Sequence, residues 1–276
     1  MPPRTISPPG AEKMSDEDRV NITLQSVFGI SKIGLRPKDE DYIVASDILT
    51  DSSHNLEVAI ILDGMGGGAA GEKASQNAGL AFIEVCEILG AGLSPESEAS
   101  ERHAFWLTCV KTCNMAVEQV AKQEGGRSGT TLTAVIVMRD GAGLPVWGDL
   151  VHVGDTRAYV GSGEEFVLHS EDHSITGEML RAGYIKIHEI EKTHGHNVLT
   201  MSLGGPDELI PQIIELDLFP GDEILLCCDG VWGPLHSETG LWVPQSDDRS
   251  KVIEMMVDEA LSRGSKDNCS ALIWSL

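Results

Sequence analysis

Residues 59–75 read AIILDGMGGGAAGEKAS, and this stretch decides between several folds and chemistries. An apolar run ends in Asp63, five glycines follow within residues 64–71, and a helical pattern begins near residue 72. A glycine-rich turn between a strand and a helix is typical of sites that bind phosphate groups. Three chemistries use such a turn, and each requires different residues around the glycines.

Two of these chemistries, a dinucleotide fingerprint and a P-loop, fit the surrounding residues poorly. Gly66, Gly68 and Gly71 match G-x-G-x-x-G, but no second strand ending in an acid follows about 20 residues later, as the fingerprint requires. A P-loop needs Gly-Lys-Ser/Thr in succession, whereas Glu72 separates Gly71 from Lys73. A nucleotide-binding oxidoreductase therefore remains an interpretation that rests on the glycines alone.

In the third interpretation, Asp63 is the chemically active residue at a strand end. The glycines then allow a tight turn, and the carbonyl of Gly64 can face the same ion as the carboxylate. Asp229 likewise follows the apolar run EILLCC, and Asp267 precedes the apolar run CSALIWS. An Asp-Gly pair alone is most often only a turn. Hard cations such as Mg²⁺ and Mn²⁺, however, take oxygen ligands from several chain segments, so the combination indicates a metal site.

Further charged residues stand beside other strand-like runs. Asp155 lies at a bend in HVGDTRAYV, and RPKDED precedes a strand-like stretch with Arg36, Glu40 and Asp41.

The composition is that of a globular protein with an acidic balance. The 276 residues are 41% hydrophobic, which is enough for one large domain or two small ones. The net charge of −23 disfavours nucleic acid or an anionic membrane as the main partner, because both need a basic face.

The location expected from the sequence is cytoplasmic. No apolar run approaches the ~20 residues that span a bilayer, and the N-terminus lacks the apolar core of a secretion signal. The six cysteines include no CxxC pair, which fits reduced, buried thiols.

Strand-like and helix-like runs come in batches. Helices are expected at 72–89, 101–123, 175–182 and 249–262, and strands at 22–29, 57–62, 131–138, 149–160, 164–168, 223–228 and 269–275. Because helices follow batches of strands rather than every strand, the pattern favours an α+β fold with antiparallel pairing. Residues 1–19, rich in proline and charge, are expected to form a disordered tail. Residues 20–276 are expected to form one domain, with a polar surface excursion at 183–211.

Six motifs, in this order and rough spacing, resemble those of the metal-dependent Ser/Thr protein phosphatases (PPM type, the type 2C class). They are RPKDED, LDGMGGG, SGTTLTAV, HVGDTRAYV, CDGVWGPL and GSKDNCS, and the resemblance covers about residues 22–275 in a bacterial style. It implies a four-layer α/β/β/α sandwich of two mainly antiparallel sheets flanked by helices. It also implies a site for two Mn²⁺ or Mg²⁺ ions, with a weak third, at one edge of the sandwich.

The resemblance assigns most metal contacts to acids at strand ends. Asp63 would bridge the two main ions, and Asp229 and Asp267 would complete the shell of the first. The remaining assignments are Glu40 and the carbonyl of Gly64 as further ligands, Asp155 at the third ion, and Asp41 on bound water.

Other residues are implied to act on the substrate or support the site. Arg36 would bind the substrate phosphate, and Thr130 and Asn268 would be supporting residues. The implied reaction is hydrolysis of phosphoserine and phosphothreonine in proteins by a metal-activated water, with Arg36, Asp63 and Asp229 as catalytic residues. The implied partners are phosphorylated proteins and a cognate Ser/Thr kinase.

The alternative is a catalytically silent relative that binds a regulatory partner. Degenerate relatives tend to lose metal ligands, whereas this sequence keeps the acids and the arginine of the two-ion site: Asp63, Asp229, Asp267, Glu40 and Arg36. Other phosphatase classes fit less well, because the chain has no DxDx[TV] motif and no cysteine with an arginine six residues later.

Three positions depart from the family pattern. Asp39 stands where bacterial relatives usually have asparagine, and Met65 where animal relatives have a histidine proposed as general acid. Gly233 replaces the acid commonly found in DGxxD, which predicts weak occupancy of the third ion. The excursion corresponds to the family's variable flap, and we interpret its histidines as solvated: His188, His194 and His196.

Overall fold

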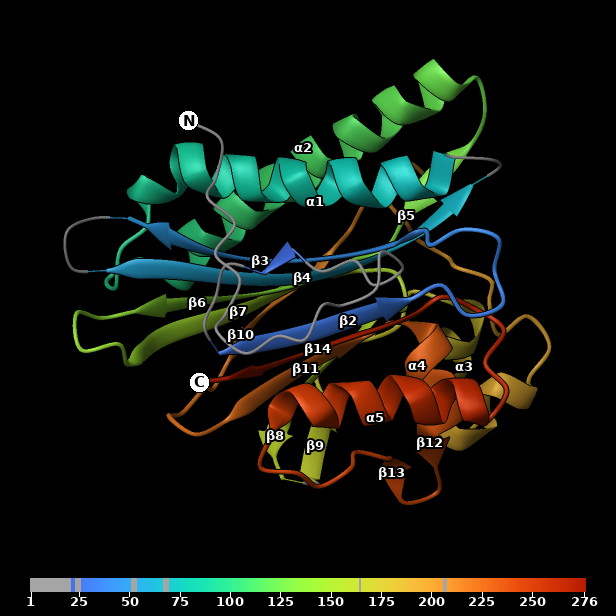
Figure 1. The fold of residues 1–276 in the computed structure, drawn as a ribbon. Helices are drawn as coiled ribbons and strands as arrows, with labels where there is room; N and C mark the ends of the chain where they lie inside the picture. The colour runs from blue at the N-terminus through green and yellow to red at the C-terminus, as the bar shows by residue number, and fades with distance from the viewer. Residues whose placement is uncertain (1–20, 23–25, 51–53, 67–69, 164, 206–207) are drawn as a thin grey trace.

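Two β-sheets pack face to face, with helices against both outer faces, in the computed structural model of the chain (Figure 1). The structure describes residues 21–22, 26–50, 54–66, 70–163, 165–205 and 208–276. The tail expected at 1–19 lies outside these residues. The predicted α+β class and the four-layer α/β/β/α sandwich are confirmed.

The first sheet has seven strands in the order β1-β3-β4-β6-β7-β10, with β5 paired to β4. Its neighbours are antiparallel except for β1 beside β3. The strands are β1 (Asn21–Ile22), β3 (Asp41–Leu49), β4 (Asn55–Gly66), β5 (Ser128–Thr130), β6 (Leu132–Arg139), β7 (Pro145–Val153) and β10 (Gln212–Leu216).

The second sheet has five antiparallel strands in the order β2-β14-β11-β8-β9. They are β2 (Val27–Lys32), β14 (Cys269–Ser275), β11 (Glu223–Cys227), β8 (Arg157–Ser162) and β9 (Glu165–Leu168). A separate two-stranded ladder joins β12 (His236–Ser237) to β13 (Gly240–Leu241).

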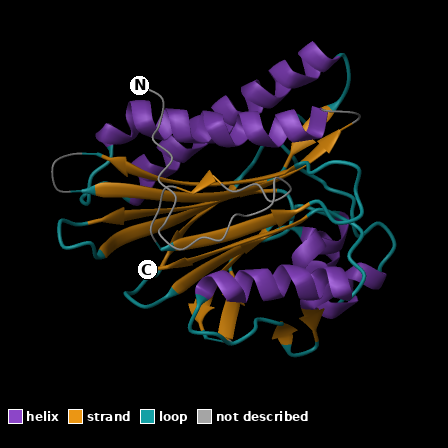
Figure 2. Cartoon of the chain, in the orientation of Figure 1, coloured by secondary structure: helices purple, strands orange, loops and turns teal. Residues whose placement is uncertain are grey.

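Helices α1 (Ala70–Leu89) and α2 (Ala99–Glu124) cover the outer face of the first sheet, and α5 (Arg249–Ser262) covers the second (Figures 1 and 2). The short helices α3 (Ile175–Arg181) and α4 (Asp229–Leu235) lie near one end of the second sheet. Two 3₁₀ turns, η1 (Gly90–Gly92) and η2 (Ile187–Lys192), complete the set. Among the described residues, none of the helices is both long and apolar enough to span a membrane.

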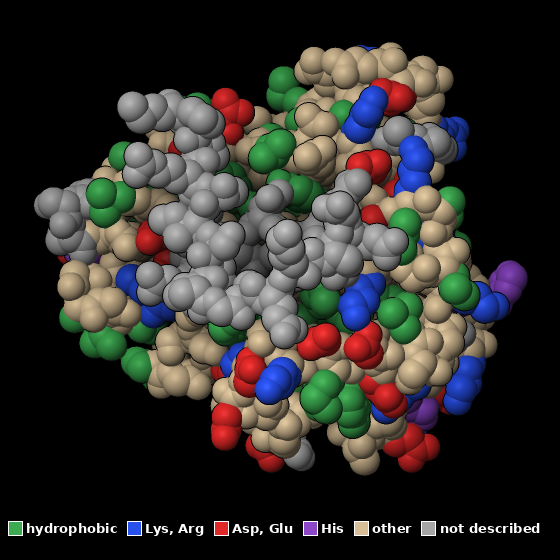
Figure 3. All heavy atoms as spheres, in the orientation of Figure 1, with side chains coloured by type: hydrophobic (Ala, Val, Ile, Leu, Met, Phe, Trp, Pro, Cys, Tyr) green, Lys and Arg blue, Asp and Glu red, His purple; other side chains and the backbone are tan. Residues whose placement is uncertain are grey.

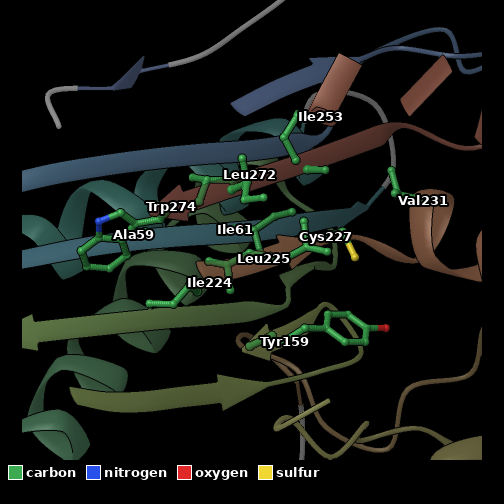
Figure 4. Packing of buried hydrophobic residues seen from close by; sticks show 14 of the residues in the cluster. Ala59, Ile61, Tyr159, Ile224, Leu225, Cys227, Val231, Ile253, Leu272 and Trp274 are labelled. Carbon is green, nitrogen blue, oxygen red and sulfur yellow. The ribbon is translucent and has the colours of Figure 1, made fainter. Parts of the chain in front are cut away.

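Strand β4 explains why its sequence is an unbroken apolar run. Ala59 and Ile61 belong to the core between the sheets, part of which Figure 4 shows, together with Leu225 of β11. Ile60 and Leu62 point the other way and pack in the core beneath α1 and α2. Successive side chains of a strand face opposite sides, so a strand covered on both faces carries no polar alternation.

The run 149–160, expected as a single strand, is divided between the two sheets. Its first half belongs to β7 in the first sheet, and its second half is β8 in the second sheet. The chain crosses between them at Gly154, whose φ of 107° is a conformation that glycine adopts most readily. Asp155 therefore lies where the chain crosses between the sheets. This crossing fixes the position of Asp155 more firmly than a bend within one strand would.

The excursion at 183–211 is anchored to the body of the protein. Ile190 and Leu203 are buried, and Leu203 forms an isolated β-bridge with Thr130. His194 and His196 are exposed, as expected, whereas His188 is half-buried and lies 3.8 Å from Glu238.

Candidate active site

Strand ends from both sheets meet at one edge of the sandwich, on the right in Figure 1. Asp41 begins β3 and is the register partner of Asp63 in β4. In the second sheet, Asp229 follows β11 and Asp267 precedes β14. Asp155 lies at the crossing from β7 to β8. The fold thus brings together five carboxylates that are far apart in the sequence.

These five carboxylates, hereafter the acidic cluster, influence one another electrostatically. Burial raises the pKa of Asp63 well above its ordinary value, and the other four carboxylates raise it further. Burial, Asp229 and Asp172 likewise raise the pKa of Asp155, against the opposing effect of Arg157. Buried like charges disfavour one another's ionisation, and a nearby cation relieves that cost.

Asp41 provides an independent test of whether a cation or its water fits here. Both of its carboxylate oxygens are buried, with no hydrogen-bond partner among the described residues. Ser270 and the thiol of Cys228, which lower the pKa of Asp41, direct their hydrogen bonds elsewhere, Ser270 to Ser31 and Cys228 to the carbonyl of Asn268. A buried carboxylate without donors is costly in a protein interior. Its chemistry therefore suits a hydrated metal.

The carboxylates of the acidic cluster interact electrostatically, but their side chains do not form a closed coordination shell around one point. Within the described part of the chain, no three His, Cys, Asp or Glu side chains converge as ligands of one ion. Burial raises the pKa of Glu40, and the charges of Arg36 and Lys38 act in the opposite direction. The structure thus places the predicted acids at one edge, and their roles as ligands stay predictions.

The backbone of Asp63 is fixed by two neighbouring threonines. Its N–H donates to Oγ1 of Thr131 at 2.8 Å. Its carbonyl accepts from Oγ1 of Thr130 and from the N–H of Thr131, both at 2.9 Å. Thr131 escaped the sequence analysis, although the doublet in SGTTLTAV contained it.

Gly64 is required by close packing of three backbone segments. A Cβ at this position would lie 2.3 Å from the carbonyl oxygen of Gly71 and 2.5 Å from that of Glu40. Gly71, in the first turn of α1, is also confined, because its Cβ would lie 2.4 Å from a side-chain carboxylate oxygen of Glu40. The glycines thus let the start of α1 approach the strand and leave room for Glu40.

Hydrogen bonds from three directions hold the backbone of Glu40. Its carbonyl accepts from Oγ of Ser75 at 2.6 Å and from the N–H of Gly64 at 3.1 Å. Its N–H donates to Oδ1 of Asn268 at 3.0 Å. Ser75 was also missed in the sequence, since its partner is 35 residues away and no local pattern marks it.

Arg36 forms an ion pair with Asp267, with Nη2 and Oδ2 at 2.5 Å. The other oxygen of Asp267 accepts from the N–H of Asn268 at 2.9 Å. The guanidinium is half exposed, so it can reach a ligand in solvent. Arg36 is thus placed at the acidic cluster, but it contacts one of the predicted metal ligands.

The CDG segment forms the start of a helix, whereas an Asp-Gly pair usually marks a turn. Asp229 is the first residue of α4, and a Cβ on Gly230 would lie 2.0 Å from the carbonyl oxygen of Asn268. This contact brings α4 against the residues preceding β14. Gly233 is buried within the same helix and has no positive φ.

The chain is similar in sequence to known protein phosphatases. The sequence profile of the family described as Protein phosphatase 2C matches residues 40–263. Protein phosphatase PhpP of Streptococcus pneumoniae is 28% identical over 222 residues, which is 79% of this chain and 85% of PhpP.

Solved structures of serine/threonine phosphatases have the same fold as this chain. The Mycobacterium tuberculosis serine/threonine phosphatase PstP/Ppp superposes with a TM-score of 0.73 at 26% identity, covering 91% of this chain and 97% of that one. A PstP catalytic domain in complex with two manganese ions gives 0.70 at 27% identity, covering 90% and 96%. With a profile match over most of its length and the carboxylate-bearing edge in place, the chain belongs to the protein phosphatase 2C family of serine/threonine protein phosphatases.

Proposed function

We propose that this protein hydrolyses phosphoserine and phosphothreonine in proteins with the help of two Mn²⁺ or Mg²⁺ ions. The observation that carries the proposal is the acidic cluster, in which carboxylates at the strand ends of both sheets raise the pKa of Asp63. The manganese-bound structure of PstP, which is similar to this chain, supports the same cofactor.

Some residues of the site would bind the metal ions, and others would bind the substrate. Asp63, Asp229 and Asp267 would hold one ion, and Glu40 with the carbonyl of Gly64 would help to hold the other. When bound, two such cations supply a nucleophilic water of lowered pKa.

Arg36 would bind the phosphoryl oxygens, because a guanidinium donates two parallel hydrogen bonds to one phosphate. Asp41 would hold bound water through the two oxygens that lack protein donors. A third ion at Asp155 would bind weakly, because Gly233 offers it no side chain.

The proposed partners are phosphorylated Ser/Thr proteins and a cognate kinase, in the cytoplasm. All six cysteines are free and buried, which fits a reducing compartment. On the face drawn in Figure 3, Lys and Arg side chains are scattered among Asp and Glu. That distribution supports a protein substrate rather than nucleic acid as the main partner.

The purified protein is expected to release phosphate from p-nitrophenyl phosphate and from a phosphothreonine peptide only when Mn²⁺ or Mg²⁺ is added. The reason is that the carboxylates would need cations to activate water. Phosphate release is measured with each ion and in excess EDTA. Full turnover in EDTA would refute the metal mechanism, and no turnover with either ion on several phosphopeptides would favour the silent module.

Arg36→Ala is expected to lower kcat/KM on a phosphothreonine peptide by about 10- to 150-fold, as loss of a charge-assisted hydrogen bond implies. Arg36→Lys should recover only part of this, because lysine cannot make the bidentate contact. The substitution also removes the ion pair with Asp267, so Mn²⁺ affinity is measured by calorimetry in parallel. Wild-type kinetics in Arg36→Ala would show that the guanidinium does not bind the phosphate.

A further inference from the structure

A pocket of about 300 Å³ opens beside the acidic cluster. Its lining consists of Arg36, Pro37, Lys38, Glu40 and Gly66. Two of these five residues are cations, in a protein with a net charge of −23. Arg36 has a proposed role in binding phosphate, whereas Lys38 has no role in the proposed mechanism.

The loop that carries both cations is held at its two ends by a single buried side chain. Nδ2 of Asn268 donates to the carbonyls of Ile33 and Lys38, both at 2.9 Å. Within the loop, the N–H of Arg36 donates to the carbonyl of Ile33 at 3.3 Å, and Pro37 fixes its own φ. The backbone from which Lys38 projects is therefore fixed, which lowers the entropy cost of using its side chain in binding.

Lys38 is exposed and supplies the second of the two positive charges that line the pocket. Two other lysines are engaged in ion pairs, since Lys32 pairs with Asp258 at 2.7 Å and Lys73 pairs with Glu124 at 2.5 Å. Across the described residues, Lys38 has no such carboxylate partner. Its charge nevertheless acts on Glu40, whose pKa is raised by burial and lowered by Arg36 and Lys38. An exposed ammonium beside the pocket is therefore available to a ligand.

We propose that Lys38 binds an acidic side chain next to the phosphorylated residue, so that the pocket selects acidic phosphopeptides. The inference rests on the proposed function and names its substrate class. Arg36 would take the phosphate, and Lys38, two positions along the same fixed loop, would take the second negative group. Because the neighbouring carboxylates repel acidic peptides, an exposed cation at this place determines whether such a peptide is accepted.

The test compares two phosphothreonine peptides that differ only in Asp or Asn beside the phosphothreonine. We expect the wild-type protein to prefer the Asp peptide by about 3- to 5-fold in kcat/KM, as an exposed ion pair would give. Lys38→Ala should bring this ratio to about one, and Lys38→Glu should reverse it. Hydrolysis of p-nitrophenyl phosphate should be unchanged in Lys38→Ala. Lys122→Ala, an exposed lysine on α2, removes the same charge elsewhere and should keep the wild-type ratio.

Two outcomes of the kinetic comparison would overturn the inference. One is an unchanged peptide ratio in Lys38→Ala. The other is an equal loss on both peptides and p-nitrophenyl phosphate, which would place Lys38 on the phosphate itself. Failure of the proposed function is distinct, since the wild type would then hydrolyse none of the three compounds. Anisotropy of the labelled peptides in EDTA reports on binding without turnover, and equal wild-type affinity for both peptides would likewise overturn the inference.

Discussion

Asp63→Asn is expected to lower metal-dependent phosphatase turnover by about 100- to 1000-fold, the loss seen when a key electrostatic group is removed from other enzymes. Asparagine keeps the shape of the side chain but removes the charge that would bridge two cations. The hydrogen bonds of Thr130 and Thr131 reach the backbone of residue 63, so they survive the substitution. Turnover of p-nitrophenyl phosphate and calorimetric Mn²⁺ affinity measure the effect. Near-normal Mn²⁺ affinity would place the metal site elsewhere.

The same variant is expected to be more stable than the wild type when metal is removed. The pKa of Asp63 is raised in the folded state by burial and by the other carboxylates of the cluster. Ionisation of this residue therefore costs folding free energy at neutral pH, and the cost disappears below the unfolded-state pKa of about 3.8. Asparagine avoids the cost, so thermal unfolding in EDTA should show a higher Tm at pH 7 and none of this advantage below pH 3.8.

Asp217→Asn provides the control for this stability effect. Asp217 is exposed and lies outside the acidic cluster, so its neutralisation should leave Tm and turnover close to the wild-type values. An Asp63→Asn protein less stable than the wild type in EDTA would contradict the pKa argument. The expected trade of metal-free stability for activity is common where a site concentrates like charges.

The edge that carries the acidic cluster could be predicted because its signals are local. Asp63 follows an apolar strand and begins a glycine-rich turn, and Asp229 and Asp267 flank the apolar runs of β11 and β14. Each pattern depends on neighbours within a few residues. The order of the motifs then carried the resemblance to a family, and that resemblance implied the architecture of two packed sheets.

The remaining parts of the site depend on distant contacts that no local pattern shows. Arg36 and Asp267 are 231 positions apart, so their ion pair could not be read from either motif. Thr131 serves the backbone of Asp63, and only the fold brings that backbone within reach of its hydroxyl. The crossing at Gly154 was also hidden, because apolar residues continue on both sides of it while the strand changes sheet.

Gly64→Ala is expected to be strongly destabilising, lowering Tm by about 5–10 °C. The added Cβ would meet two backbone carbonyl oxygens, those of Gly71 and Glu40. Neither can move without displacing the start of α1 or the segment that precedes β3. Thermal unfolding in EDTA measures the effect without any contribution from metal binding.

Substitutions of two other glycines distinguish this steric clash from the general effect of replacing glycine by alanine. Gly126→Ala should leave Tm nearly unchanged, because a Cβ there meets nothing within 4 Å and no positive φ is required. In Gly71→Ala, the nearest atom is the flexible carboxylate of Glu40, so the side chain can swing away. That variant should lose less stability than Gly64→Ala but should bind Mn²⁺ more weakly, because Glu40 is displaced. If Gly64→Ala and Gly126→Ala unfolded at the same temperature, close approach of the backbones would not be what requires glycine at residue 64.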